Sequence, residues 1–182
     1  MSHLSQQARL GAHAPAMFDP ARFAPQYPPD LGLELLHLDI DLWLDLAEST
    51  AQGAVTTRVQ ANRQGAQEIA FDAVGLAVTA VEDGDGSALD WRADGEKLYV
   101  RWLQPFAKGQ QAYVRIRYSV TAPTAGLYFS RPTAESPDAP WYAVTDHETE
   151  RARHWLPCID LPNVRTALDI RLRANSCLTI LA

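Results

Sequence analysis

The sequence predicts an all-β domain with antiparallel strands, and three observations support this prediction. Apolar and polar residues alternate with a period of two over several segments, which places the apolar side chains on one face of a strand. Gly, Asp and Pro residues that favour turns separate these segments at intervals of about ten residues. No segment has the convincing apolar period of an amphipathic helix.

Residues 1–30 precede the first predicted strand and are expected to form an irregular arm on the surface. The prolines of this segment are Pro15, Pro20, Pro25, Pro28 and Pro29. Proline fixes φ and removes a backbone donor, so neither a helix nor a central strand is expected here. Phe18, Phe23 and Tyr27 could attach the arm to the domain.

The clearest strand covers residues 36–46, where every second residue is apolar. These apolar residues are Leu36, Leu38, Ile40, Leu42, Leu44 and Leu46. The alternation places them on the core face, with His37, Asp39, Asp41 and Asp45 toward solvent. The three aspartates are spaced like calcium ligands, but the remainder of a calcium-binding loop is missing, so a solvated strand face is the simpler interpretation.

Further strands are expected at residues 55–62, 67–72, 76–81, 97–103, 112–120, 168–174 and 177–181. Residues 83–86, Asp-Gly-Asp-Gly, and the pair 94–95, Asp-Gly, have the composition of tight turns between strands. In the 168–174 segment, Asp169, Arg171 and Arg173 are expected to face outward. The aromatic residues of these strands could form a sugar-binding platform, although core packing is their commoner role.

Composition excludes several classes of function. The net charge is −6 and the 16 Lys and Arg residues form no run, so a nucleic-acid partner is not expected. No apolar run approaches the roughly 20 residues of a membrane-spanning helix, and a secretory signal is not expected. Two cysteines, Cys158 and Cys177, are expected to be buried free thiols. We therefore expect a cytoplasmic protein.

The most informative segment covers residues 145–165. Six of its residues match a family pattern at fixed offsets: Glu148, Arg153, Pro157, Cys158, Asp160 and Pro162. The pattern is Gln-x-Glu, four residues, then Arg-x-x-x-Pro-Cys-x-Asp-x-Pro-x-x-Lys. The segment thus resembles the M1 family of zinc aminopeptidases, which includes leukotriene A4 hydrolase. Residues 126–130, Gly-Leu-Tyr-Phe-Ser, agree with it too, while Arg165 replaces the usual Lys.

The resemblance implies that residues 31–182 form a saddle-like domain of two packed sheets, truncated before a catalytic zinc domain. It implies that Glu148 binds the α-amino group of a peptide substrate, because a carboxylate complements a terminal ammonium. Asp146 stands at the Gln position, a departure from the pattern. It either helps to hold the ammonium or biases the site toward basic first residues.

No His-Glu-x-x-His motif, the usual zinc-binding pair of a metallopeptidase helix, occurs in the chain. The resemblance implies that zinc is bound by residues of the catalytic domain downstream of residue 182. This chain alone is therefore expected to contain no catalytic residue and no metal ligand, and to be inactive. Its implied partners are a peptide substrate and that catalytic domain.

Simpler interpretations of the same residues remain. His147 and His154 lie seven residues apart, about 11 Å along a helix, too far to share one zinc ion. Arg153 and Asp160 are expected to form a structural ion pair. For the whole chain, the alternatives are a stand-alone β-sandwich binding module and a catalytically dead scaffold paralogue.

Overall fold

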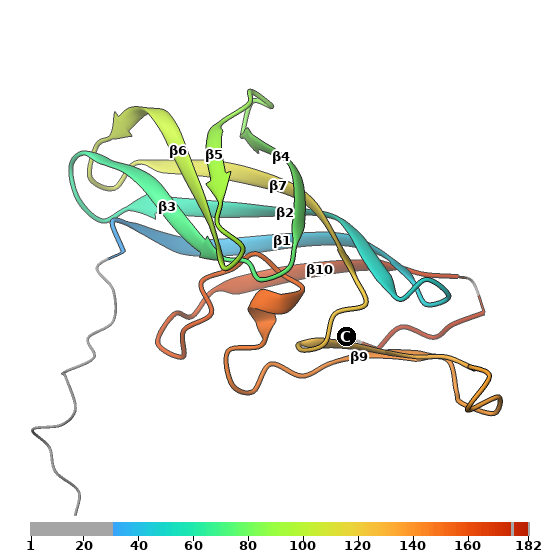
Figure 1. Ribbon diagram of the computed structural model, residues 1–182. Helices are drawn as coiled ribbons and strands as arrows, with labels where there is room; N and C mark the ends of the chain where they lie inside the picture. Colours follow the sequence, from blue (N-terminus) through green and yellow to red (C-terminus); the bar gives the residue numbers. More distant parts are fainter. Residues whose placement is uncertain (1–30, 176, 182) are drawn as a thin grey trace, which may run out of the picture.

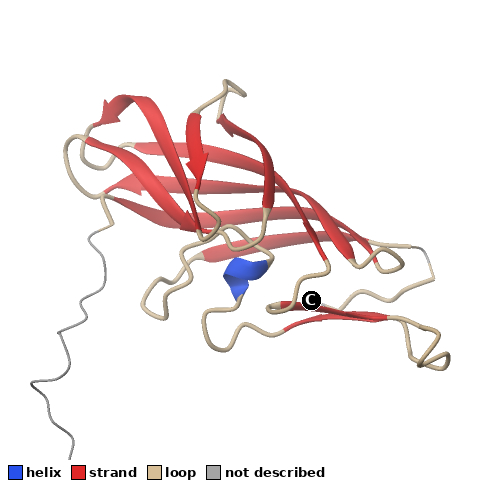
Figure 2. Ribbon diagram, in the orientation of Figure 1, coloured by secondary structure: helices blue, strands red, loops and turns tan. Residues whose placement is uncertain are grey.

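The computed structural model describes residues 31–175 and 177–181, so the predicted arm over residues 1–30 lies outside the described residues. Nearly all regular structure in the described part is β-strand (Figure 2). The strands are β1 (Leu33–Asp45), β2 (Thr50–Ala61), β3 (Ala66–Asp72), β4 (Ala77–Asp83), β5 (Asp90–Ala93), β6 (Lys97–Phe106), β7 (Gln111–Thr121), β8 (Leu127–Ser130), β9 (Tyr142–Thr145) and β10 (Ala167–Arg173). A short 3-10 helix, η2 (Ala152–His154), lies between β9 and β10.

The strands form two packed sheets and a hairpin (Figure 1). The large sheet has the order β10-β1-β2-β7-β4, the small sheet has the order β3-β6-β5, and β8 pairs with β9. One hydrophobic core contains buried residues from both sheets, including Ile40 of β1, Val55 of β2 and Val100 of β6. The all-β antiparallel prediction is confirmed, with one addition: β10 pairs with β1 in parallel.

The alternation of β1 differs from the prediction at its beginning. A β-bulge lies between Leu35 and His37 in the pairing of β1 with β2. A bulge inserts one extra residue and so exchanges the two faces of the strand. Leu33 and Leu35 are consequently buried, whereas Leu36 is only half-buried and leaves the core face. From Leu38 onward the predicted face is buried as expected, except that Leu44 is only half-buried.

β10 is an edge strand. The alternation of its sequence suggested a buried apolar face, but this face is exposed. Leu168 is 52% exposed and Ile170 is 41% exposed. The predicted polar face is confirmed: Asp169 contacts His37 at 3.1 Å, and Arg171 contacts Asp41 at 3.1 Å. β10 is therefore joined to β1 through main-chain pairing and surface charges.

The expected strand over residues 177–181 is wrong. Residues 177–181 form a turn followed by irregular chain, and the nitrogen of Leu178 donates to the Asn175 oxygen. Strands β5, β8 and β9 were not among the predicted strands because each is only four residues long. No helix in the described residues has the length and apolar character that a bilayer crossing requires.

Candidate functional site

Asp146 and Glu148, the two predicted site residues, lie together on the 146–151 loop that follows β9. The nitrogen of Asp146 donates to the Gly126 oxygen at 3.0 Å, which extends the β8–β9 pairing into the loop. Gly126 has a φ of +77°, and a Cβ there would collide with the Arg151 carbonyl oxygen. The absence of a side chain at residue 126 thus allows the end of the loop to approach β8 closely.

The carboxylate of Asp146 organises the 146–151 loop. Its Oδ1 accepts the backbone N–H of Glu148 at 3.1 Å, an Asx-type turn contact. Its Oδ2 accepts a hydrogen bond from Arg151 Nη1 at 3.0 Å. The same nitrogen of Arg151 contacts the Tyr128 hydroxyl of β8 at 3.1 Å. Sequence reasoning missed Arg151 and Tyr128, although Tyr128 falls within the 126–130 segment that matches the family.

The Glu148 side chain is exposed and has no hydrogen-bond or ionic partner among the described residues. Its neighbour Asp146 is, by contrast, already paired with Arg151. The loop therefore presents one free carboxylate from a backbone that its neighbours hold. Such a group can accept charge-assisted hydrogen bonds from a cation.

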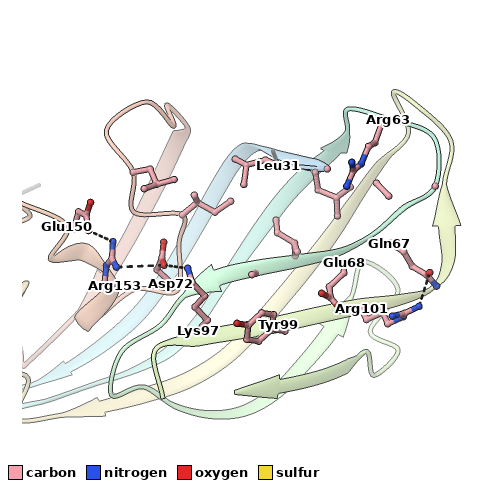
Figure 3. A pocket seen from close by; sticks show the side chains of 18 residues that line it. Leu31, Arg63, Gln67, Glu68, Asp72, Lys97, Tyr99, Arg101, Glu150 and Arg153 are labelled. Atoms are coloured by element: carbon pink, nitrogen blue, oxygen red, sulfur yellow. Dashed lines mark hydrogen bonds and ion pairs between the residues drawn. The ribbon is translucent and has the colours of Figure 1, made fainter. Parts of the chain in front are cut away.

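A cluster of charges fixes the chain after the loop to the end of β3. Arg153 donates to Asp160 Oδ2 from its main-chain nitrogen at 3.1 Å and from Nε at 3.2 Å, which confirms the predicted structural pair. Asp72 of β3, buried to 5% exposure, binds Lys97 Nζ at 2.6 Å and accepts the N–H of Asp160 at 3.0 Å. Arg153 also binds Glu150 at 2.9 Å. Figure 3 shows Glu150, Arg153, Asp72 and Lys97 in a row.

Two groups near this cluster have shifted pKa values. Burial raises the pKa of the Cys158 thiol, and the carboxylates of Asp160 and Asp72 raise it further. Burial alone would lower the pKa of Arg153, but its hydrogen bond to Asp160 and the charge of Asp72 outweigh this, so the net shift is upward. The thiol is therefore held neutral and the guanidinium charged. Cys158 is buried as predicted, whereas Cys177 is exposed, which corrects that expectation.

A groove of about 710 Å³ runs along β3, with Leu31 and Arg63 near one end and Glu150 and Arg153 near the other (Figure 3). Glu148 is not among the residues that line it. The groove and the free carboxylate are therefore separate features of the surface. The chemistry of an exposed, unpaired carboxylate makes the loop the stronger candidate site.

No group of three or more His, Cys, Asp or Glu side chains in the described residues is arranged to hold a metal ion. The Nε2 atom of His147 accepts a hydrogen bond from Trp155 Nε1 at 3.0 Å and is not free to bind a metal. The described residues thus do not fit a zinc ion.

Comparison with known proteins identifies relatives of the whole described domain. The Peptidase M1 N-terminal domain family matches residues 34–182. Leukotriene A4 hydrolase from Saccharomyces cerevisiae superposes with a TM-score of 0.67 at 20% identity, over 85% of this chain and 27% of that chain. A mutant M1 zinc metallopeptidase from Deinococcus radiodurans gives 0.65 at 26% identity, over 79% and 32%.

A structure of the Deinococcus radiodurans mutant enzyme bound to a Tyr-Ser-Ala substrate gives a TM-score of 0.63 at 24% identity, over 79% of this chain and 33% of that chain. No curated protein sequence matches the chain. The chain spans about a quarter to a third of the length of the structures that it resembles.

Proposed function

The chain belongs to the M1 peptidase family as an N-terminal domain, and on this basis we propose that it anchors the amino terminus of a peptide in a zinc aminopeptidase. Its relatives among solved structures include M1 zinc metallopeptidases. In the intact protein, the catalytic zinc is bound by residues outside this chain.

Glu148 is the proposed anchor. The observation that carries this assignment is that its carboxylate is exposed and unpaired while the loop that bears it is fixed. A terminal ammonium carries one positive charge and three donors, and a carboxylate accepts such donors strongly. An enzyme that removes residues from the amino terminus needs this contact, because a fixed anchor determines which peptide bond reaches the reacting groups.

Asp146 is proposed to act with Glu148, mainly by holding the loop. Both of its oxygens are engaged, Oδ1 by the Glu148 N–H and Oδ2 by Arg151. The Arg151 guanidinium compensates its charge, so a second free negative charge is not added beside Glu148. Because both oxygens are engaged within the loop, Asp146 is proposed to hold the loop that bears Glu148, in place of a direct contact with the ammonium or a selection of basic residues.

The domain also has surface suited to the rest of such an enzyme. Large apolar side chains are exposed on the hairpin and on the edge strand, among them Trp141, Tyr142, Val144, Leu168 and Ile170. Exposed apolar groups of this size commonly mark contacts with another domain. We propose that the catalytic domain covers part of them. Two free thiols fit a reducing compartment, and the cytoplasm is the proposed location.

The test is kinetic and uses the intact enzyme. A hydrogen bond to a charged group contributes roughly 1.5–3 kcal/mol, so Glu148→Gln should lower kcat/KM for a free tripeptide by about ten- to a hundredfold. Glu135→Gln is the matched control, because Glu135 is an exposed carboxylate on the connection between β8 and β9. Equal activity of the Glu148→Gln enzyme and the wild type would refute the proposal.

A further inference from the structure

His147, which lies between Asp146 and Glu148, has no role in the anchoring just described. Its residue is exposed, yet its Nε2 atom lies 3.0 Å from the indole nitrogen of Trp155, whose residue is only 4% exposed. The two rings are 5.7 Å apart and inclined by 22°. This contact joins a loop at the surface to a side chain of the core.

The chemistry of the two rings fixes the direction of the bond. An indole N–H can only donate, so Nε2 of His147 must be the acceptor. An imidazole that accepts at Nε2 carries its proton on Nδ1 and is neutral. The contact therefore requires a residue at position 147 with an acceptor atom at this distance, and it satisfies a donor that would otherwise be buried without a partner.

Trp155 is itself held in place. It belongs to the hydrophobic core, and its main-chain nitrogen donates to the Ala152 oxygen at 3.1 Å. Its Cδ1 atom lies beside Gly126, the residue before β8, 3.1 Å from the position that a Cβ there would take. His147 in turn is joined to Arg151, whose nitrogen donates to the His147 oxygen at 3.3 Å. The indole thus holds the loop at the residue next to Glu148.

We propose that His147 is a positioning residue for Glu148: its neutral imidazole, held by the Trp155 indole, fixes the backbone from which the anchoring carboxylate projects. The proposal rests on the proposed function, because it assigns His147 no contact with the peptide. The alternative is simple ring packing, in which any apolar side chain of similar size at position 147 would serve as well.

Kinetics of the intact enzyme distinguish these two roles. His147→Leu keeps much of the volume and removes the acceptor, and it should lower kcat/KM for a free tripeptide about three- to tenfold. His147→Gln retains an acceptor oxygen and should stay within about twofold of the wild type. Equal activity of the His147→Leu enzyme and the wild type, or equal loss in both variants, would overturn the proposal.

A double-mutant cycle with Trp155→Phe tests whether the two residues act through their bond. The variant that combines Trp155→Phe with His147→Leu should have a kcat/KM no lower than that of the less active single variant. A kcat/KM reduced by the product of the two single losses would contradict the proposal. Because Trp155→Phe alters the core, the indole N–H resonance of Trp155 provides a second measurement. It should move when His147 is replaced by Leu, and an unmoved resonance would show that the bond is absent.

Glu148→Gln in the same assay separates the two hypotheses. If Glu148→Gln loses activity and His147→Leu does not, the positioning role fails and the anchor stands. If Glu148→Gln has wild-type activity, the proposed function fails.

Discussion

Arg153 donates to Oδ2 of Asp160 from both its main-chain nitrogen and its Nε, at 3.1 and 3.2 Å, and to the Asp160 main-chain oxygen from Nη2 at 3.0 Å. The same arginine lies 3.8 Å from the carboxylate of Asp72. Asp72 and Cys158 also exchange two main-chain hydrogen bonds. These contacts connect η2 and the chain that follows it to β3, and so provide a fixed base for the 146–151 loop.

Replacement of Arg153 should test this base. Removal of one partner from a buried ion pair costs about 3–5 kcal/mol. The Arg153 side chain is 22% exposed, so we expect Arg153→Ala to lower the free energy of unfolding by about 2–3 kcal/mol. Arg115→Ala, at an exposed arginine of β7, should change it by less than about 0.5 kcal/mol. Urea denaturation provides both values, and equal effects would contradict the structural role of Arg153.

Alanine substitutions at Gly126 and Gly75 together test whether the close approach of the 146–151 loop to Gly126 contributes to stability. Both have positive φ, +77° and +70°, but a Cβ at Gly75 meets no atom within 4 Å, whereas one at Gly126 meets the Arg151 carbonyl. Gly75→Ala should therefore cost only the backbone strain of about 1–2 kcal/mol. Gly126→Ala should cost a further 1–3 kcal/mol. Equal losses in thermal or urea unfolding would show that the close approach is unimportant.

Cys158 should be unreactive in the folded protein and destabilising at alkaline pH. Burial raises its pKa above the ordinary value near 8.5. The folded state therefore retains a proton that the unfolded state loses, so this contribution to stability is complete below about pH 8.5 and is lost as the pH rises above it. Iodoacetamide should modify Cys177 alone in the native protein and both thiols after denaturation.

The Cys158→Ala variant is the control for this loss of stability at alkaline pH. Burial also raises the pKa of Tyr118, so stability should still decline at higher pH in Cys158→Ala. That variant should nevertheless lose stability less steeply than the wild type between about pH 8 and 10. Identical slopes for the two proteins would contradict the assignment to Cys158.

Asp146→Gln tests whether Asp146 holds the loop or selects basic residues. Because Arg151 already pairs with Asp146, we expect kcat/KM to fall by about three- to tenfold for peptides that begin with Arg, Leu or Ala alike. Arg151→Gln should reproduce this uniform loss, since it removes the other half of the pair. A fall confined to the Arg peptide would instead assign charge selection to Asp146.

Local patterns predicted most of the long strands because each has a single buried face. The bulge at Leu36 was not predictable from alternation, since one extra residue exchanges the faces without changing the composition. Strands β5, β8 and β9 are too short to have a detectable period. The exposed face of β10 was misjudged because alternation shows that a face is apolar and does not show what covers it.

In the candidate site, too, some residues could be predicted from the sequence and others could not. The resemblance of the 145–165 segment to the M1 family selected Glu148 and Asp146, whose roles stay predictions, and the Arg153–Asp160 pair expected there is present. Sequence reasoning could not find Asp72, which is 88 residues from Asp160 and is brought to it only by the fold. The contact of His147 with Trp155 was missed because both side chains have common alternative roles.

The most direct test of the anchor compares peptides with a free and an acetylated amino terminus on the intact enzyme. Acetylation removes the positive charge that Glu148 is proposed to bind, so the wild type should show a kcat/KM ratio of at least about ten in favour of the free peptide. For the Glu148→Gln enzyme, the same kcat/KM ratio should be about two or less. A ratio in the Glu148→Gln enzyme as large as in the wild type would contradict the account.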